Sequence, residues 1–206
     1  DGTKEPLTVK TAGKKALNYL SKTMCMTIPI IMGAAMFRTL AVLCGDGMLG
    51  IWSADSDIYN FFYNWIYNAG YYFLPVYLGW AAAKQLGCSQ PLGMMLGGVL
   101  IAPEFMTLVN AAADSGATTT MVYGVLPAQL NNYSATVLPM LLSMPVLMVV
   151  EKFMKKIIPD MLSTVFVPVC TMAVMTPVSL CALAPIGSIL GDLVGNFMFG
   201  LGNAGG

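Results

Sequence analysis

The chain has 206 residues, of which 57% are hydrophobic and 10% are charged, and its net charge at neutral pH is zero. Soluble domains usually carry about 25% charged residues, so this composition excludes a soluble enzyme and a disordered chain. A neutral chain also lacks the basic field that a nucleic-acid-binding protein needs. The composition therefore predicts a polytopic membrane protein.

Five stretches of the sequence are apolar enough to cross a bilayer, which takes about 17–25 residues. In chain order these predicted spans are residues 24–44, 61–83, 91–109, 133–150 and 161–185. Membrane-spanning strands are shorter, about 9–11 residues, and alternate in polarity, so we predict an all-α fold. A Gly-Gly pair and Pro103 predict that the third helix is broken. A sixth stretch, 186–202, carries Asp192 and is either an interfacial helix or the start of another span.

The lysines indicate how the five predicted spans are oriented. All nine lie before the first span, between the second and third, or between the fourth and fifth. The loops on the opposite side contain four aspartates and no lysine or arginine. Positively charged loops are cytoplasmic, so we predict a cytoplasmic segment or linker over 1–22 and a membrane domain over 23–206. Because the chain starts without methionine, we expect it to be a piece of a longer polypeptide.

Prolines recur inside the predicted spans, and each tends to kink a helix. Such breaks are typical of transporters and channels, which have other helices or a wet cavity to satisfy the freed carbonyl groups. Two sets of glycines at helical spacing predict close helix packing. These sets are Gly93, Gly97 and Gly98, and Gly187, Gly191 and Gly195.

Two charged residues lie within the predicted spans, Arg38 in the first and Glu104 in the third. A charge at the centre of a membrane helix costs at least about 2.5–3.5 kcal/mol, so both side chains are expected to face protein or water. Both fall toward the outer side, which makes an ion pair between them the structural interpretation. A role in substrate binding or gating is the functional alternative.

Polar and aromatic residues gather on the predicted outer side. The sequence Asn131-Asn132-Tyr133-Ser134 either caps the helix of the fourth span or presents amide and hydroxyl groups to a sugar. Asn132, Tyr133 and Ser134 are therefore candidate substrate-binding residues. In the preceding outer loop, residues 123–127 are candidates for a short re-entrant or strand-like piece. Aromatic residues between positions 52 and 73 fit an interfacial belt, with a sugar-stacking surface as the alternative.

Lys152, Lys155 and Lys156 lie in the predicted cytoplasmic loop after the fourth span. Binding to anionic lipid is the simplest interpretation of such a cluster, and docking of an acidic or phosphorylated partner is the alternative. The chain contains no histidine, which removes the commonest general base and metal ligand, and no nucleotide-binding or hydrolase motif. The five cysteines are interpreted as small buried residues. We therefore expect no metal, no cofactor and no catalytic residue within this sequence.

Several stretches resemble the membrane enzyme II C permeases of the bacterial sugar phosphotransferase system (PTS), in the glucose and beta-glucoside superfamily. They are YFLP at 72–75, AAAK at 81–84, LIAP at 100–103, NYS at 132–134, VLP at 137–139, EKFMKKIIP at 151–159, FVP at 166–168 and APIG at 184–187. The family often has histidine before the proline of the third stretch, where this chain has Ala102. The resemblance covers residues 16–187.

The resemblance implies the N-terminal half of such a permease, a component of a protein-N(pi)-phosphohistidine–sugar phosphotransferase. In such a protein a sugar enters from outside and binds in the C-terminal half, which carries a Gly-Ile-Thr-Glu-Pro segment. Enzyme II B then phosphorylates the sugar at the cytoplasmic face, where the lysine cluster would lie. The implied partners are a sugar of the beta-glucoside, sucrose, trehalose or glucose type, the enzyme II B and II A domains, the bilayer of the bacterial cell membrane, and a second copy in a homodimer. A non-transporting membrane scaffold and a small solute channel are the alternatives.

Overall fold

The computed structural model describes residues 9–116 and 118–204, and most of this part of the chain is helical. The elements in chain order are α1 (Val9–Cys44), α2 (Asp57–Asn60), η1 (Phe61–Ile66), α3 (Tyr67–Tyr71), α4 (Leu74–Leu86), α5 (Gln90–Leu100), α6 (Pro103–Ser115), β1 (Thr119–Val122), β2 (Leu126–Gln129), α7 (Leu138–Ile157), α8 (Asp160–Val178), η2 (Ser179–Leu183) and α9 (Ala184–Ala204). The segments η1 and η2 are π-helical, with hydrogen bonds between residues five apart. Each continues directly into an α-helix.

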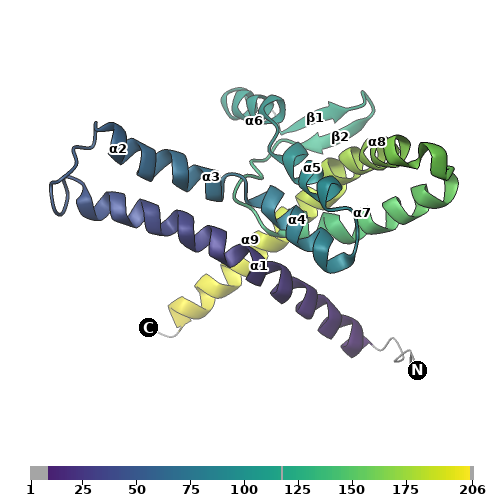
Figure 1. The fold of residues 1–206 in the computed structure, drawn as a ribbon, viewed down its shortest axis with the longest axis horizontal. Helices are drawn as coiled ribbons and strands as arrows, with labels where there is room; N and C mark the ends of the chain where they lie inside the picture. Colours follow the sequence, from purple (N-terminus) through teal and green to yellow (C-terminus); the bar gives the residue numbers. More distant parts are fainter. Residues whose placement is uncertain (1–8, 117, 205–206) are drawn as a thin grey trace.

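The C-terminal half of α1 and the α2–η1–α3 segment lie side by side and form a two-helix arm (Figure 1). Aromatic packing holds the arm together. The ring of Phe62 in η1 stacks on Phe37 of α1, with ring centroids 5.4 Å apart, and on Trp52 of the connecting turn, at 5.5 Å. The arm thus joins the first predicted span to the start of the second.

The remaining helices surround a hydrophobic core to which α4, α5, α7 and α8 contribute. The large side chains that are fully buried there are Leu78, Leu96, Leu100, Met140, Met144, Leu147 and Met175. The helices α4 and α5 make the closest backbone approach. A Cβ atom on Gly79 would overlap the carbonyl oxygen of Gly93, and one on Gly97 would overlap that of Pro75. The close packing predicted at Gly93 and Gly97 is confirmed, with α4 as the partner helix.

The second set of glycines is only partly in contact. A Cβ atom on Gly187 would overlap the backbone of Pro139 at the start of α7, whereas one on Gly191 would make an ordinary contact with Leu138. Around Gly195, no atom of the described chain lies within 4 Å of that position. Close packing at this set is therefore confirmed at Gly187 alone.

The third predicted span is broken as expected. The helix α5 ends at Leu100 and α6 begins at Pro103, because a proline has no N–H to donate to the preceding turn. The all-α prediction is corrected after α6. There β1 and β2 form an antiparallel hairpin, with Thr119 opposite Gln129.

The hairpin turn explains this departure from a helical fold. Tyr123 and Gly124 both have positive φ angles, of 54° and 70°, which a helix does not allow and which a tyrosine adopts rarely. The Tyr123 hydroxyl donates a hydrogen bond to the Ala173 carbonyl of α8, at 2.9 Å. This contact docks the tip of the hairpin on α8. Of residues 123–127, the first three form the turn and the last two begin β2, so the strand-like interpretation is confirmed for residues 126–127 alone.

The helix of the fourth predicted span starts later than the sequence indicates. Its first residue is Leu138, and the N-cap position is taken by Val137, whose side chain has no hydrogen-bonding group. The interpretation of the preceding Asn-Asn-Tyr-Ser sequence as a helix cap is therefore wrong. Ala135 has a positive φ of 57°. A right-handed helix does not allow this angle, so α7 can begin only after Ala135.

Three segments of the described chain are long and apolar enough to cross a membrane: Thr11–Cys44, Gln90–Ser115 and Asp160–Gly200. They contain the first, third and fifth predicted spans. The second is interrupted between α3 and α4, and α7 has 13 residues from Leu138 to Val150 before its first charge. Those residues cover about 20 Å, against about 30 Å of hydrocarbon. The sixth stretch continues from α8 through η2 into α9 without a break.

Replacing Gly79 with alanine is expected to destabilise the protein by about 1–3 kcal/mol, as overpacking usually does. The added methyl group would meet the Gly93 carbonyl, and two helix backbones would have to separate. Thermal unfolding of the full-length protein in detergent measures the effect.

The matched control is Gly98→Ala, because no atom of the described chain lies within 4 Å of its Cβ position. Alanine is favoured over glycine in a helix by about 0.5–1 kcal/mol, so this variant should be as stable as the wild type or slightly more so. Equal melting temperatures for the two variants would contradict the packing described above.

Candidate functional site

Arg38 is held by tyrosines in the two-helix arm. Its Nη2 donates a hydrogen bond to the Tyr63 hydroxyl at 2.8 Å. Its guanidinium carbon lies 4.4 Å from the centroid of the Tyr63 ring and 4.3 Å from that of Tyr67. Cation–π contacts of this kind contribute about 0.5–2 kcal/mol each. Arg38 thus joins α1 to η1 and α3.

The predicted ion pair between Arg38 and Glu104 is not formed. Glu104 is exposed in the first turn of α6, while the Arg38 guanidinium contacts Tyr63 and Tyr67 of the arm. The signal that could have identified the true partners is the spacing of four residues between Tyr59, Tyr63 and Tyr67, which places side chains on one side of a helix.

A polar groove lies beside the β-hairpin, where α6 ends. Its volume is about 520 Å³. The residues that line it are Val109, Ala112, Ala113, Gly116, Thr118, Gln129, Leu130, Asn131 and Asn132. Three side-chain amides and one hydroxyl therefore converge on one concave surface, and these groups can both donate hydrogen bonds to the hydroxyls of a sugar and accept them.

The three candidate residues before α7 take different positions around this groove. Asn132 lines it, and its Oδ1 accepts hydrogen bonds from the Ser134 amide at 2.9 Å and from the Ser134 hydroxyl at 2.5 Å. Tyr133 points the other way, is 1% exposed and stacks on Phe105 of α6. The groove residues Gln129 and Thr118 lie in and beside the hairpin, and sequence reasoning did not single them out.

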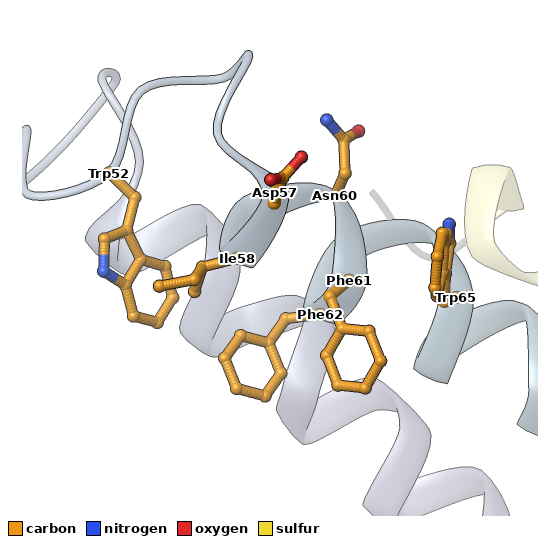
Figure 2. Close-up of a pocket in the computed structure, with 7 residues that line it drawn as sticks. All are labelled: Trp52, Asp57, Ile58, Asn60, Phe61, Phe62 and Trp65. Carbon is orange, nitrogen blue, oxygen red and sulfur yellow. The ribbon is translucent and has the colours of Figure 1, made fainter.

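An aromatic groove of about 560 Å³ lies on the arm. Figure 2 shows the rings of Trp52, Phe61 and Phe62 on one side, with Asp57 and Asn60 on the other. The side chain of Trp65 is 70% exposed and that of Phe61 is 45% exposed. An apolar surface with a polar edge is what a membrane interface favours, so this arrangement agrees with the interfacial belt.

The three lysines of the predicted cytoplasmic cluster are exposed at the end of α7. Lys155 Nζ lies 2.6 Å from Glu151 Oε1, and this is the one salt bridge within residues 11–116 and 118–200. Lys152 and Lys156 project from the same last turns of the helix, where positive charges also complement the helix dipole. The cluster can therefore present a cationic surface to a partner.

Glu151 connects two loops that are distant in the sequence. It is 2% exposed, and its Oε2 accepts a hydrogen bond from the Ser89 amide at 3.0 Å. Ser89 is the N-cap residue of α5, so the carboxylate satisfies a backbone donor at a helix start, where negative charge is favoured. A cleft of about 360 Å³ opens next to this contact, between the ends of α7 and α8. Sequence reasoning did not assign this role to Glu151.

Cys88 lies in the turn between α4 and α5, next to this contact. Burial raises the pKa of the Cys88 thiol above its ordinary value, and the negative charge of Glu151 raises it further, against the opposing effect of Lys155 and Lys152. A raised pKa keeps a thiol protonated and unreactive at neutral pH. The described residues also contain no group of three or more His, Cys, Asp or Glu side chains that could hold a metal ion.

Comparison with known proteins identifies the family. Residues 21–206 match the family described as "Phosphotransferase system, EIIC". The mannose-specific EIIBCA component of Corynebacterium glutamicum is 34% identical over 192 residues, which is 91% of this chain and 27% of that protein. The chain therefore belongs to the PTS EIIC family, as the sequence motifs predicted. No solved structure matches the chain significantly.

Two further relatives are named for other sugars. The arbutin-, cellobiose- and salicin-specific EIIBC component of Escherichia coli is 26% identical over 95% of this chain and 39% of its own length. The sucrose-specific EIIBC component of Klebsiella pneumoniae is 30% identical over 71% of this chain and 32% of its own length. The chain thus spans between about a quarter and two fifths of the length of these three relatives.

The environment of Cys88 leads to a prediction about its reactivity. In a variant whose other cysteines are replaced by serine, alkylation of Cys88 should reach half its maximal rate at a pH above the ordinary value of about 8.5. Adding Glu151→Gln should move this midpoint to lower pH, because the raising charge is removed while the two lysines remain. The rate of reaction with iodoacetamide as a function of pH measures both effects.

Glutamine at position 151 still offers an oxygen to the Ser89 amide, so the local structure should be kept. Glu104→Gln is the matched control, since this carboxylate is exposed on α6 and is not among the groups that shift the Cys88 pKa. A midpoint that moves equally in both variants would contradict a direct effect of Glu151.

Proposed function

We propose that this chain is the N-terminal part of the membrane domain of a bacterial PTS permease, which translocates a sugar and couples its transport to phosphorylation. The observation that carries the proposal is family membership over residues 21–206, on a chain whose long apolar helices can cross a bilayer. The membrane domain would begin near residue 23, after a cytoplasmic segment of residues 1–22. The surroundings are the bacterial plasma membrane, with the protein as a homodimer.

The proposed topology has five spans, a partial sixth and a cytoplasmic N-terminus. Its support is the hydrogen bond between Glu151 and Ser89. The loop that contains Ser89 follows Lys84, and Glu151 directly precedes the lysine cluster of α7. Two of the lysine-bearing segments therefore meet at one end of the structure, as expected if both face the cytoplasm.

The cytoplasmic partners in this proposal are enzyme II B and enzyme II A, as separate chains or as domains of the same chain. Lys152 and Lys156 are exposed and unpaired within the described residues, so they remain available to an acidic or phosphorylated surface. The raised pKa of the Cys88 thiol makes it a poor phosphoryl acceptor. Phosphoryl transfer would then involve a group on the partner domains.

On the outer side, the polar groove is the proposed contact for the entering sugar. Asn132 lines the groove. In this proposal Ser134 positions the Asn132 side chain through its two hydrogen bonds to Oδ1, and Tyr133 anchors the segment from the core. Arg38 and Glu104 do not line the groove. The sugar is of the beta-glucoside, sucrose, trehalose or glucose type.

Sugar uptake by cells that express the full-length protein tests this function. Uptake of radiolabelled sugars of these types should depend on phosphoenolpyruvate, and the sugar should accumulate as its phosphate. Asn132→Ala should raise the sugar concentration needed for half-maximal uptake by roughly 2–10-fold, which corresponds to one neutral hydrogen bond. The matched control Asn110→Ala, exposed on α6 outside the groove, should leave it unchanged.

Other results would favour the alternatives. Uptake without phosphoenolpyruvate or phosphorylation would indicate a solute channel, and failure of every sugar of these types would indicate a scaffold. If uptake is normal but Asn132→Ala equals its control, the permease function stands and the outer groove is not a sugar contact.

The topology has its own test in single-cysteine variants of the full-length protein. A membrane-impermeant maleimide should label Thr118→Cys in intact cells, because Thr118 is exposed and lines the outer groove. Lys152→Cys should react only after the membrane is permeabilised. Labelling of both positions from the same side would contradict the proposed five-span arrangement.

A further inference from the structure

Arg38 carries a charge at a depth that requires an explanation. It lies six residues before the end of α1 at Cys44, within the segment Thr11–Cys44, which is long and apolar enough to cross a membrane. At 1.5 Å per residue this is about 9 Å from the helix end. The headgroup layers add about 10–15 Å in total to a hydrocarbon core of about 30 Å, and a long arginine side chain can extend toward them. The guanidinium is therefore within reach of lipid phosphates.

The structure supplies this cation with neutral partners. Its contacts are the Tyr63 hydroxyl and the rings of Tyr63 and Tyr67. The only salt bridge among the side chains of residues 11–116 and 118–200 joins Lys155 and Glu151. A guanidinium has five N–H donors, and one of them is used in the hydrogen bond to Tyr63. Both the charge and most of the donors of Arg38 are left for another group.

A groove of about 430 Å³ is present where that group would bind. Its lining residues are Ala35, Arg38, Thr39, Val42, Tyr67 and Tyr71. The Thr39 hydroxyl lies in this lining and donates to the Ala35 carbonyl at 2.9 Å. Rotation about χ1 would turn this one donor from the carbonyl to an acceptor in the groove. A guanidinium next to hydroxyl groups is a setting that suits the oxygens of a phosphate.

The surface of α1 on the N-terminal side of the groove is apolar. Met36 and Met32 precede Thr39 in α1 at steps of three and four residues. Their side chains are 64% and 60% exposed. Residues three or four apart share one face of a helix, so these side chains lie on the same side as Thr39. A ligand that filled the groove with a phosphate could place a hydrocarbon chain along this face. A free phosphate ion would leave that face unused.

From these observations, we infer that Arg38 and Thr39, with Tyr67 and Tyr71 beside them, bind the phosphodiester group of a membrane phospholipid. The lipid lies in the leaflet at the Cys44 end of α1, which is the outer leaflet in the proposed topology, and its acyl chains follow Met36 and Met32. The lipid phosphate neutralises Arg38 and fills the groove between α1 and α3. This site goes beyond the proposed transport function, because neither a sugar nor a phosphoryl donor takes part in it.

Native mass spectrometry of the full-length protein, purified from membranes in mild detergent, tests the site. The wild type should retain one tightly held phospholipid per chain, and 1-palmitoyl-2-oleoyl-phosphatidylglycerol should restore it after delipidation. Arg38→Gln should weaken retention roughly ten-fold or more, as expected for charged hydrogen bonds. Millimolar inorganic phosphate should not displace the lipid, since it lacks the acyl chains.

Two milder variants keep the test decisive if Arg38→Gln fails to fold. Arg38→Lys keeps the charge but loses the planar pair of donors, and Thr39→Val removes the hydroxyl, so each should weaken retention a few-fold. Lys84→Gln is the matched control, because it removes a cation that lies 5.4 Å from the centroid of the Trp80 ring on α4, outside this groove.

Several results would overturn the site. These are a wild type without retained phospholipid, full retention by both Arg38 variants, an equal loss in Lys84→Gln, or displacement by inorganic phosphate. A disulfide that forms under an added oxidant between Arg38→Cys and a cysteine placed at an acidic position, elsewhere in the full-length protein or in a second copy, would place a protein carboxylate beside position 38 and exclude the lipid.

Discussion

The backbone contact between α4 and α5 is the constraint on which the other helices depend. The two helices approach at Gly79, Gly93 and Gly97, where a side chain would overlap a carbonyl group of the facing helix. In a lipid environment the hydrophobic effect does not drive helices together, so close van der Waals packing has to do so. The helix α4 also packs on α1 and α7, and α5 packs on α8. This one pair therefore positions the two-helix arm on one side and the lysine-bearing end of α7 on the other.

Several polar side chains make contacts that tie two elements together, while the buried hydroxyls of Thr23, Tyr133 and Thr171 have no hydrogen-bond partner within the described residues. Arg38 joins α1 to η1 and α3 through tyrosines, and Glu151 joins the end of α7 to the start of α5. Ser143 of α7 and Ser179 of η2 are fully buried and lie 3.0 Å apart. An unpaired buried polar group is costly. Contacts that pair such groups therefore favour one arrangement of the helices, which glycine packing alone does not specify.

The two ends of this scaffold have different chemistry, which is the basis of the proposed transport function. One end has amides and hydroxyls around the groove beside the hairpin, and the other has exposed lysines next to a buried carboxylate. A sugar and an acidic or phosphorylated domain are the partners that these two chemistries suit. The raised pKa of Cys88 fits the proposal that phosphoryl transfer uses a group on the partner domains.

Much of this could be predicted from the sequence, because membrane insertion, helix breaks and loop charge depend on residues that are close together in the chain. Three of the five apolar spans, the break at Pro103 and the EIIC motifs are of this kind. Tertiary structure alone decided which groups meet. It paired Arg38 with Tyr63, 25 residues away, instead of Glu104, and Glu151 with Ser89, 62 residues away. It also placed a hairpin at residues 119–129 and delayed α7 to Leu138. Such contacts depend on which helix faces pack together, and local sequence does not determine that.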